Sequence, residues 1–351
     1  MTIEKSPQPK FNKTLHLVRG LCAVGVAAYH YISWEYGIAI ESAGAFLVYI
    51  FFTLSALTMM MVHAEDFGKG IKFDVIAEFY RRRAARILPL LVFVAILASS
   101  YSILLSGAGL SVETLARAYL TGSLLMGLQM PGMSSGVVAA WSLGIESVFY
   151  LVFPTLALVA CNVRLRTIII ATVLLLVGQQ SAIVLIQRET DPVFWFRYAN
   201  PLVFSPFFAI GVIIYFRPLQ ARVANFWLSI AALLSVAGFS LIFPMDVYRN
   251  PVVYLLLTAL SGAAVLTAYS ADVPVRAAKA SAFLGDISYA LYLTHWFAYK
   301  GSSWAASKVG VEVAQPFLFV LFAVGMAYLL YRYLEKPARG WLRGNRRPSI
   351  G

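Results

Sequence analysis

Residues Leu15 to Tyr36, LHLVRGLCAVGVAAYHYISWEY, decide the fold, because this segment can cross a bilayer and yet contains Arg19 and His30. Eleven residues at about 100° each make about three helical turns, so an α-helix places both side chains on one face, about 16 Å apart. An ionisable side chain at the bilayer centre costs about 2.5–3.5 kcal/mol, so one that is present usually faces a cavity and takes part in function. The competing interpretation is that Arg19 snorkels to the headgroups and His30 only packs.

The composition predicts an all-α polytopic membrane protein with a single domain over residues 1–351. Of its residues 60% are hydrophobic and 13% are charged, whereas soluble domains average about 25% charged. The net charge of +12 comes from clusters between apolar runs, as the positive-inside rule predicts, and we expect no nucleic-acid partner. The two cysteines lie in or beside apolar segments and the four histidines are scattered, so we expect neither a disulfide framework nor a metal site.

Charge and hydropathy predict ten membrane spans with both termini in the cytoplasm. The spans are 15–36, 44–62, 86–106, 137–160, 167–186, 201–216, 226–243, 252–270, 283–299 and 314–331. The N-terminal tail 1–13 and the C-terminal tail 332–351 are both basic, which requires an even number of spans. Segment 112–130 is therefore expected to be re-entrant or to lie on the outer surface. The aromatic loop 191–198 reads as a membrane-interface belt, with a glycan-stacking surface as the alternative.

This topology sets the depth of the unusual residues. Arg82 and Arg86, four apart on one helical face, stand at the cytoplasmic mouth of their span. Their guanidinium groups suit phosphate, although arginines at such a position are more often topology signals. Glu146 lies about 13 Å from the outer face, at a depth close to that of His30. Its carboxylate needs a partner, and structural pairing with an arginine is as good an explanation as chemistry.

A polar stripe is expected late in the chain, where Ser288, Tyr292 and His295 follow at intervals of four and three residues. Such a stripe usually lines a cavity, although Tyr292 could serve packing alone. Together these residues predict a basic inner vestibule leading to a His/Glu/His centre nearer the outer face. That arrangement suits a reaction whose anionic donor enters from the cytosol.

Six stretches, in this order, resemble the motifs of the acyltransferase-3 family of integral membrane acyltransferases. They are RGLCAVGVAAYH with Arg19 and His30; FFTLSA with Ser55; RRAAR with Arg82 and Arg86; WSLGIESVFYLVFP with Trp141, Glu146, Tyr150 and Pro154; SYALYLTHW with His295; and YLEKPARGW. Two positions depart from the family pattern: Ala56 stands where glycine is usual, and Trp296 stands where proline is common.

The resemblance implies transfer of an acyl group, often acetyl, from cytosolic acyl-CoA to a hydroxyl on a glycan or lipid-linked glycan. It implies that His30 is the base and that Arg19, Arg82 and Arg86 handle the donor. From depth we add Glu146 as a catalytic partner that orients or steadies His30. Ser55, Trp141, Ser288, Tyr292 and His295 are expected to line the cavity. Acyl-CoA would be a co-substrate with no resident cofactor, and the protein would be a multi-pass protein of the bacterial inner membrane without an appended periplasmic domain.

Two other classes of function remain open at this point. A proton-coupled secondary transporter would use the same intramembrane His, Arg and Glu residues, although no inverted repeat is visible. A membrane scaffold would leave the shared face of Arg19 and His30 unexplained. Among acceptors, O-antigen, exopolysaccharide, a Nod-factor-like oligosaccharide, peptidoglycan and a small natural product are all compatible with the sequence. The residues do not separate direct transfer from an acyl-enzyme route, nor do they fix the oligomeric state.

Overall fold

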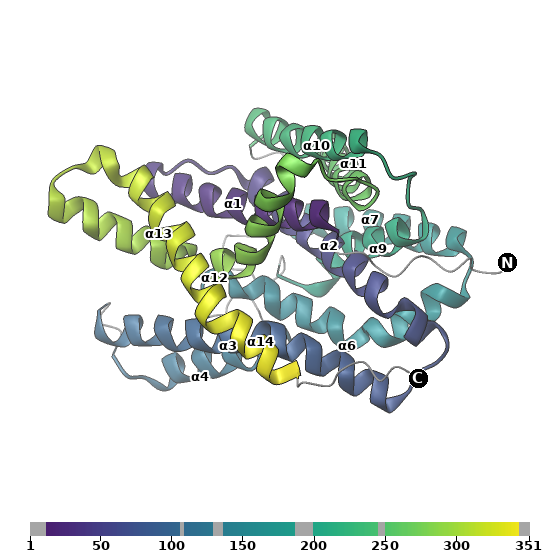
Figure 1. The fold of residues 1–351 in the computed structure, drawn as a ribbon, viewed down its shortest axis with the longest axis horizontal. Helices are drawn as coiled ribbons and strands as arrows, with labels where there is room; N and C mark the ends of the chain where they lie inside the picture. The colour runs from purple at the N-terminus through teal and green to yellow at the C-terminus, as the bar shows by residue number, and fades with distance from the viewer. Residues whose placement is uncertain (1–11, 106–108, 129–135, 187–198, 245–249, 344–351) are drawn as a thin grey trace. The chain divides into compact units, whose positions relative to one another are not determined.

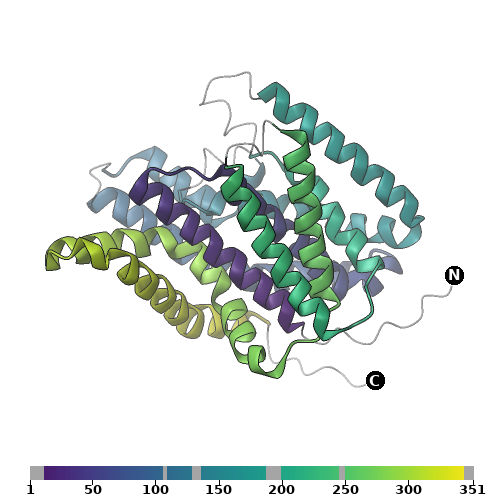
Figure 2. The same ribbon diagram turned by 90° about the horizontal axis from the view of Figure 1, so that it is seen from above.

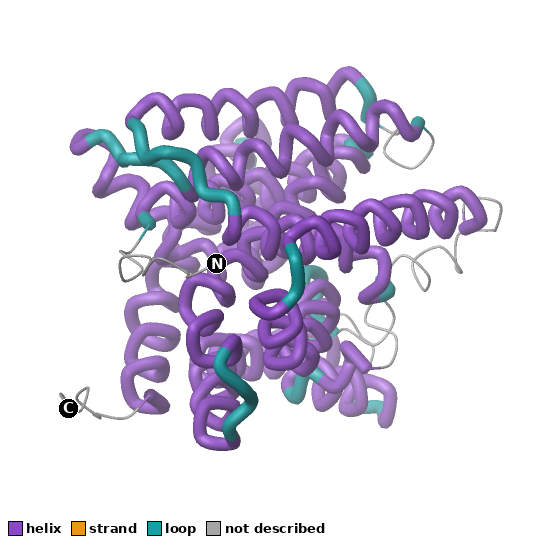
Figure 3. Tube along the Cα trace, turned by 90° about the vertical axis from the view of Figure 1, so that its right-hand side faces the viewer, coloured by secondary structure: helices purple, strands orange, loops and turns teal. Residues whose placement is uncertain are grey.

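The computed structural model describes residues 12–105, 109–128, 136–186, 199–244 and 250–343, and these residues fold into helices (Figure 3). Within them there is no β-strand beyond an isolated bridge between Arg222 and Ala271. The helices are α1 Lys13–Tyr36, α2 Glu41–Gly68, α3 Phe73–Leu104, α4 Val112–Gly122, α6 Ala140–Asn162, α7 Leu165–Ile186, α9 Pro201–Phe216, α10 Val223–Ile242, α11 Pro251–Tyr269, α12 Ala278–Val309, α13 Gln315–Leu330 and α14 Lys336–Arg343, with short 3₁₀ turns η1 Leu125–Leu128, η3 Val275–Ala277 and η4 Glu312–Ala314 and a π-helical turn η5 Tyr331–Glu335.

Local chemistry explains where the first helix begins and ends. The Asn12 side chain accepts hydrogen bonds from the backbone N–H groups of Thr14 and Leu15, both at 3.0 Å, which satisfies two otherwise unpaired donors of α1. At the other end Gly37 adopts the left-handed conformation with φ of 66°, which glycine adopts without steric cost. The α1 helix is therefore defined by its own sequence at both ends.

The prediction of an all-helical polytopic membrane protein is confirmed. Among the described residues, seven helices are long and apolar enough to cross a membrane: α1, α2, α3, α6, α10, α11 and the helix running from Gln315 to Leu342. Large apolar side chains such as Ile96, Leu234 and Phe317 are more than 60% exposed, which suits contact with lipid. Every span predicted from the sequence coincides largely with a helix, whereas the number of spans and their orientation remain predictions.

Segment 112–130 does not form a long helix. The α4 helix has eleven residues, which corresponds to about 16 Å, whereas the hydrocarbon core is about 30 Å thick. Leu124 then interrupts the path with a positive φ of 63° before η1 begins. These features favour the expectation that the segment does not span. The aromatic belt predicted at 191–198 lies outside the described residues, as do most of residues 1–13 and 344–351 of the two basic tails.

The chain divides into two compact units, each built from separated segments. The first unit comprises Met1–Gly70, Thr155–Val184 and Phe204–Asp286, and the second comprises Ile71–Pro154, Leu185–Val203 and Ile287–Gly351. Both α6 and α12 contribute residues to each unit. Because the segments alternate along the sequence, the units are not consecutive domains, and the single-domain prediction stays a prediction.

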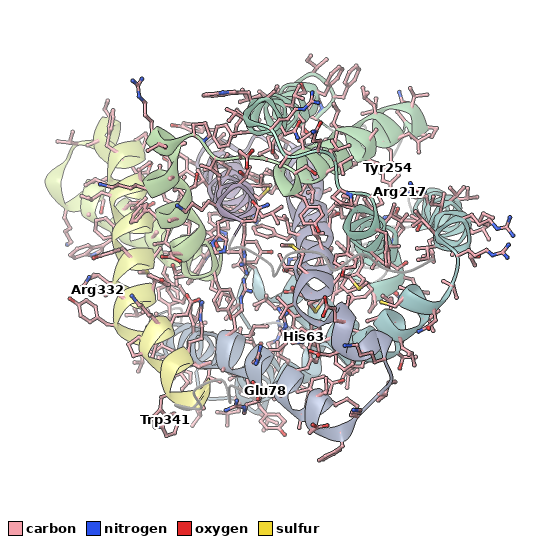
Figure 4. All side chains as sticks on the ribbon, turned by 45° about the vertical axis from the view of Figure 1, so that its right-hand side comes forward. His63, Glu78, Arg217, Tyr254, Arg332 and Trp341 are labelled. Carbon is pink, nitrogen blue, oxygen red and sulfur yellow. The ribbon has the colours of Figure 1, made fainter. Side chains whose placement is uncertain are left out.

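In the first unit, α1, α2, α10 and α11 pack side by side (Figure 2). Their core contains Leu15, Val18, Cys22, Ile50, Leu54, Leu57, Ile214, Val265 and Ala268. An aromatic cluster joins α2, α9 and α11, with the rings of Tyr49 and Phe207 stacked at 4.1 Å. The Tyr254 hydroxyl of α11 (Figure 4) donates a hydrogen bond to Gln179 of α7. These contacts hold α1 and α2, which carry predicted site residues, in a close-packed bundle.

In the second unit, α3 lies beside α4 and contacts α14 (Figure 1). The Phe79 ring of α3 stacks on Phe153 of α6 at 5.3 Å. On the other side of the unit, Gln315 donates a hydrogen bond of 2.9 Å to Ser303 of α12. The predicted basic tail does not begin as free chain, because η5 and α14 continue the helix to Arg343, and Trp341 of α14 is 83% exposed (Figure 4).

Candidate active site

The first unit carries Arg19 and His30 on α1. The helix runs without interruption from Lys13 to Tyr36, so the two side chains share a face and lie about 16 Å apart along it. Both are half-buried. The imidazole of His30 stacks on the Trp34 ring at 4.9 Å with an interplanar angle of 18°, and the Tyr29 ring tilts against it at the same distance. Two aromatic neighbours therefore restrict the orientation of the histidine ring.

Ser55 lies in the middle of α2 in the same unit and is 8% exposed. Its neighbour Ala56, which stands where the family commonly has glycine, packs against α9 at Gly211. A Cβ added to Gly211 would lie 2.8 Å from the Ala56 Cβ and 2.3 Å from the Thr53 carbonyl oxygen. Glycine on α9 thus makes room for the alanine on α2, and the departure from the family pattern is accommodated by packing.

The arginine run at the start of α3 separates into two environments. Glu78 binds Arg81 at 2.6 Å and Arg82 at 2.5 Å, and all three side chains are 36% exposed or more. Exposed pairs of this kind are worth about 0–1 kcal/mol. Arg82 was predicted from the sequence to handle the donor. It lies on the exposed face of α3 and pairs with the carboxylate of Glu78 on the same helix (Glu78 is labelled in Figure 4).

The next arginine, Arg83, faces inward. Its guanidinium carbon lies 5.5 Å from the centre of the Phe79 ring and 5.6 Å from that of Tyr150 on α6. Its Nε is buried and has no hydrogen-bond acceptor among the described residues. Arg86, three residues further on, is also half-buried and interacts electrostatically with Tyr150 and Tyr289. Sequence reasoning missed Arg83, and its spacing of one turn from Arg86 was the signal that could have identified it.

Glu146 lies one helical turn before Tyr150 on α6, is half-buried, and interacts with the hydroxyl groups of Tyr150 and Tyr289. We call Arg83, Arg86, Glu146, Tyr150 and Tyr289 the arginine cluster. Inside the second unit, Tyr150 therefore interacts with the Glu146 carboxylate and with the guanidinium groups of Arg83 and Arg86. His30 belongs to the first unit, and its partnership with Glu146 stays a prediction.

The predicted stripe on α12 is present and buried, since Ser288, Tyr292 and His295 are 2%, 6% and 0% exposed. The Tyr292 hydroxyl forms a hydrogen bond of 2.8 Å with Ser142 of α6. The Nδ1 of His295 lies 2.8 Å from the Tyr292 carbonyl oxygen, and because a carbonyl only accepts, Nδ1 carries the proton. Trp141, also on α6, is half-buried. The stripe thus joins α12 to α6 through a polar contact.

A buried ion pair at the end of α13 was not predicted. Glu335 is 1% exposed, lies in the π-helical turn η5, and pairs with Arg339 of α14. Glu335 also interacts electrostatically with Tyr289, whose hydroxyl donates a hydrogen bond of 2.8 Å to the Ile87 carbonyl of α3. A π-turn is an uncommon helical feature that often occurs at functional sites. Tyr289 therefore interacts both with Glu335 and with members of the arginine cluster.

Comparison with known proteins places these residues in a family. Residues 12–332 match the family described as "Acyltransferase domain". The chain is also 29% identical over 210 residues to the exopolysaccharide production protein ExoZ of Rhizobium meliloti (strain 1021), an alignment that covers 57% of this chain and 61% of that protein. No solved structure matches the chain. The match covers nearly the whole chain and includes both α1 and the arginine cluster, so this protein belongs to the acyltransferase-3 family.

Proposed function

We propose that this membrane acyltransferase moves an acetyl group from cytosolic acyl-CoA to a hydroxyl of a cell-surface or secreted glycan, and that it does so in the bacterial inner membrane. The observation that carries the proposal is the face of α1, where an uninterrupted helix presents Arg19 and His30. The similarity to a protein named for exopolysaccharide production favours an exopolysaccharide as the acceptor.

In the proposed reaction His30 acts as general base. Neutral imidazole takes the proton of the acceptor hydroxyl while the oxygen attacks the thioester carbonyl carbon. The new C–O bond forms and the C–S bond breaks, so that CoA leaves as a thiolate and takes up the proton. The aromatic rings of Trp34 and Tyr29 hold the imidazole in orientation. Direct transfer and a transient acyl-enzyme both require such a base.

The donor would be held by guanidinium groups, because they bind phosphate in bidentate fashion. Arg19 is the candidate on α1, and Arg82 and Arg86 are the candidates from the sequence on α3. We add Arg83 as a candidate, because it faces inward over Tyr150 and its Nε has no hydrogen-bond acceptor within the part of the chain that the structure describes. Glu146 would balance the charge of the arginine cluster, or steady His30 as predicted from depth.

The test is acetyl transfer by the purified protein in lipid nanodiscs, with labelled acetyl-CoA and exopolysaccharide fragments. We expect label to move to the glycan with release of CoA, whereas a proton-coupled transporter would do neither. His30→Ala should still bind CoA and should transfer acetyl at least about 100-fold more slowly. The matched control is His63→Gln, which replaces a buried histidine of the neighbouring α2 (Figure 4) and should keep the wild-type rate.

Two results would count against the proposal. If wild-type protein releases no CoA with any glycan, the enzymatic function is wrong. If His30→Ala turns over at a near-normal rate with matched expression, His30 is not the base and α1 has a packing role.

A further inference from the structure

A pocket of about 230 Å³ lies in the second unit, and none of its lining residues was predicted to act in catalysis. Its walls come from the last turns of α3, from the turn before α6 and from the middle of α12. The residues that matter for its chemistry are Tyr101, Ser102, Val137, Trp296 and Phe297. Because all of them belong to one compact unit, the pocket is formed within that unit.

Two aromatic rings form a corner in this pocket. The centres of the Tyr101 and Trp296 rings are 4.9 Å apart, and the ring planes meet at 85°. Phe297 adds a third aromatic side chain to the wall, and Ser102 contributes a hydroxyl. The ammonium group of Lys300 lies 5.8 Å from the centre of the Trp296 ring, so a positive charge stands beside the corner. The pocket therefore combines aromatic and aliphatic walls with one serine, and the Lys300 ammonium group lies near the Trp296 wall.

The pocket is too small to enclose a whole acyl-CoA molecule. Pockets for drug-sized ligands have volumes of about 300–1,000 Å³, and acyl-CoA is larger than most such ligands. A single pyranose ring is of the right scale. It presents C–H groups on its faces, which pack favourably on aromatic rings, and hydroxyl groups around its rim, which need hydrogen-bond partners. The rings of Tyr101 and Trp296 can pack on the faces of the sugar. Ser102 and Lys300 can form hydrogen bonds with its hydroxyl groups.

The predicted topology places the pocket on the side where such a sugar would be. Tyr101 is three residues before the end of α3 and Trp296 lies in the predicted outer half of α12, so both rings belong to the outer part of their helices. Trp296 also stands where the family commonly has proline, so the indole wall is a feature of this chain and not of the family pattern. A pocket residue that differs from the family pattern, such as Trp296, can give this chain a preference for one acceptor over another.

We propose that this pocket is an acceptor subsite that binds one pyranose unit of the glycan against Trp296 and Tyr101. The inference rests on the proposed function for the identity of the acceptor, and the binding itself is independent of acyl transfer.

Saturation-transfer NMR on the protein in phospholipid nanodiscs tests the proposal without acyl-CoA and without a maltoside detergent that would compete. The probes are cellobiose, lactose and maltose. We expect saturation of the C–H protons of at least one disaccharide by wild-type protein. Trp296→Ala should weaken that binding about tenfold, because it removes one of the two aromatic faces of the corner. Trp296→Tyr, which keeps an aromatic face, should retain most of it.

The matched control is Trp304→Ala, because Trp304 lies two turns further along α12 and is 65% exposed outside the pocket. This variant should bind as wild type does. Tyr101→Ala serves as a second variant should Trp296→Ala fail to fold, and it too should weaken binding. Absence of saturation for all three disaccharides, or equal binding by Trp296→Ala, would overturn the proposal. So would Trp296-dependent saturation of lipid acyl-chain protons alone, since the pocket would then hold lipid. Binding without any acetyl transfer would instead reject the proposed function and leave the sugar site intact.

Discussion

At the scale of single residues, the contrast between Arg82 and Arg83 bears most directly on how the donor is held. The two are adjacent in sequence, yet Arg82 is exposed and bound to Glu78, whereas Arg83 lies over the Phe79 and Tyr150 rings. A helix turns by about 100° per residue, so neighbours face different surroundings. The inward arginine is the one whose planar guanidinium is held by aromatic contacts before any ligand arrives.

We therefore expect Arg83→Lys to weaken CoA binding about tenfold or more, because lysine keeps the charge and loses the planar fork. Arg82→Lys should stay close to wild type, since an ammonium group can replace its exposed pair with Glu78. Isothermal titration of both variants with CoA measures the difference. If Arg82→Lys weakened CoA binding and Arg83→Lys did not, Arg82 would be the donor-binding residue. If both variants bound CoA with wild-type affinity, the arginine run would be a topology signal only.

The sequence was sufficient to identify Arg19 and His30, because a charged pair in an apolar helix is visible without any tertiary information. It could not distinguish Arg83 from Arg82. That distinction depends on Tyr150 of another helix and on Glu78, which lies one turn earlier in α3. Glu335 was missed for a similar reason, since its burial comes from the packing of η5 and α14. The role of such a residue depends on which way its helix face points and on which helices pack against it, so it can be assigned only from the folded structure.

At the scale of helices, the crossing of α2 and α9 depends on Gly211. A Cβ at this position would lie 2.3 Å from the Thr53 carbonyl oxygen, and the backbone there cannot move as a flexible side chain would. The Thr53 hydroxyl also donates a hydrogen bond of 3.0 Å to the Phe207 carbonyl across the same crossing. Small residues permit this close approach of helices in membranes.

Gly211→Ala should therefore lower the free energy of unfolding by about 1–3 kcal/mol, the usual cost of overpacking. Thermal unfolding in detergent, followed by intrinsic fluorescence, measures the effect. Gly238→Ala on α10 is the control, because a Cβ there has open space, and alanine is favoured over glycine in a helix by about 0.5–1 kcal/mol. An unchanged midpoint in Gly211→Ala would show that the two helices separate without cost.

Hydropathy located the helices well and their ends poorly. The predicted span 44–62 lies inside α2, which continues to Gly68, and the predicted span 283–299 lies inside α12, which runs from Ala278 to Val309. Hydropathy marks the part of a helix that suits hydrocarbon, whereas backbone hydrogen bonding continues into the polar region beyond it. Ser303, which accepts a hydrogen bond from Gln315, lies in one of these additional turns, and hydropathy did not predict a helix at that position.

At the scale of the whole molecule, the arrangement of basic residues supports one orientation of the chain in the membrane, namely the one with both termini in the cytoplasm. The fold by itself does not determine this orientation. The ten predicted spans agree with helices, and segment 112–130 contains the eleven-residue α4 and the break at Leu124. A helix of about 16 Å cannot cross a core of about 30 Å. With that segment excluded, the predicted number of spans is ten, and the predicted topology puts the basic clusters on one side, as the positive-inside rule requires.

This orientation makes a prediction for reporter fusions placed after residues 110, 134 and 190. All three should report the outer side. Fusions after residue 70, which follows Lys69, and after residue 220, which precedes Arg222, should report the cytoplasm. The pair at 110 and 134 is the decisive one, because it brackets α4. Opposite signals from these two would mean that the segment spans and that every later helix is reversed. Trp296 would then lie on the opposite side from Tyr101, although their rings are in contact at 4.9 Å, so this outcome would contradict both the ten-span topology and the pocket. Equal outer signals would place the pocket on the outer side of the membrane, which is the side that the proposed acceptor subsite requires.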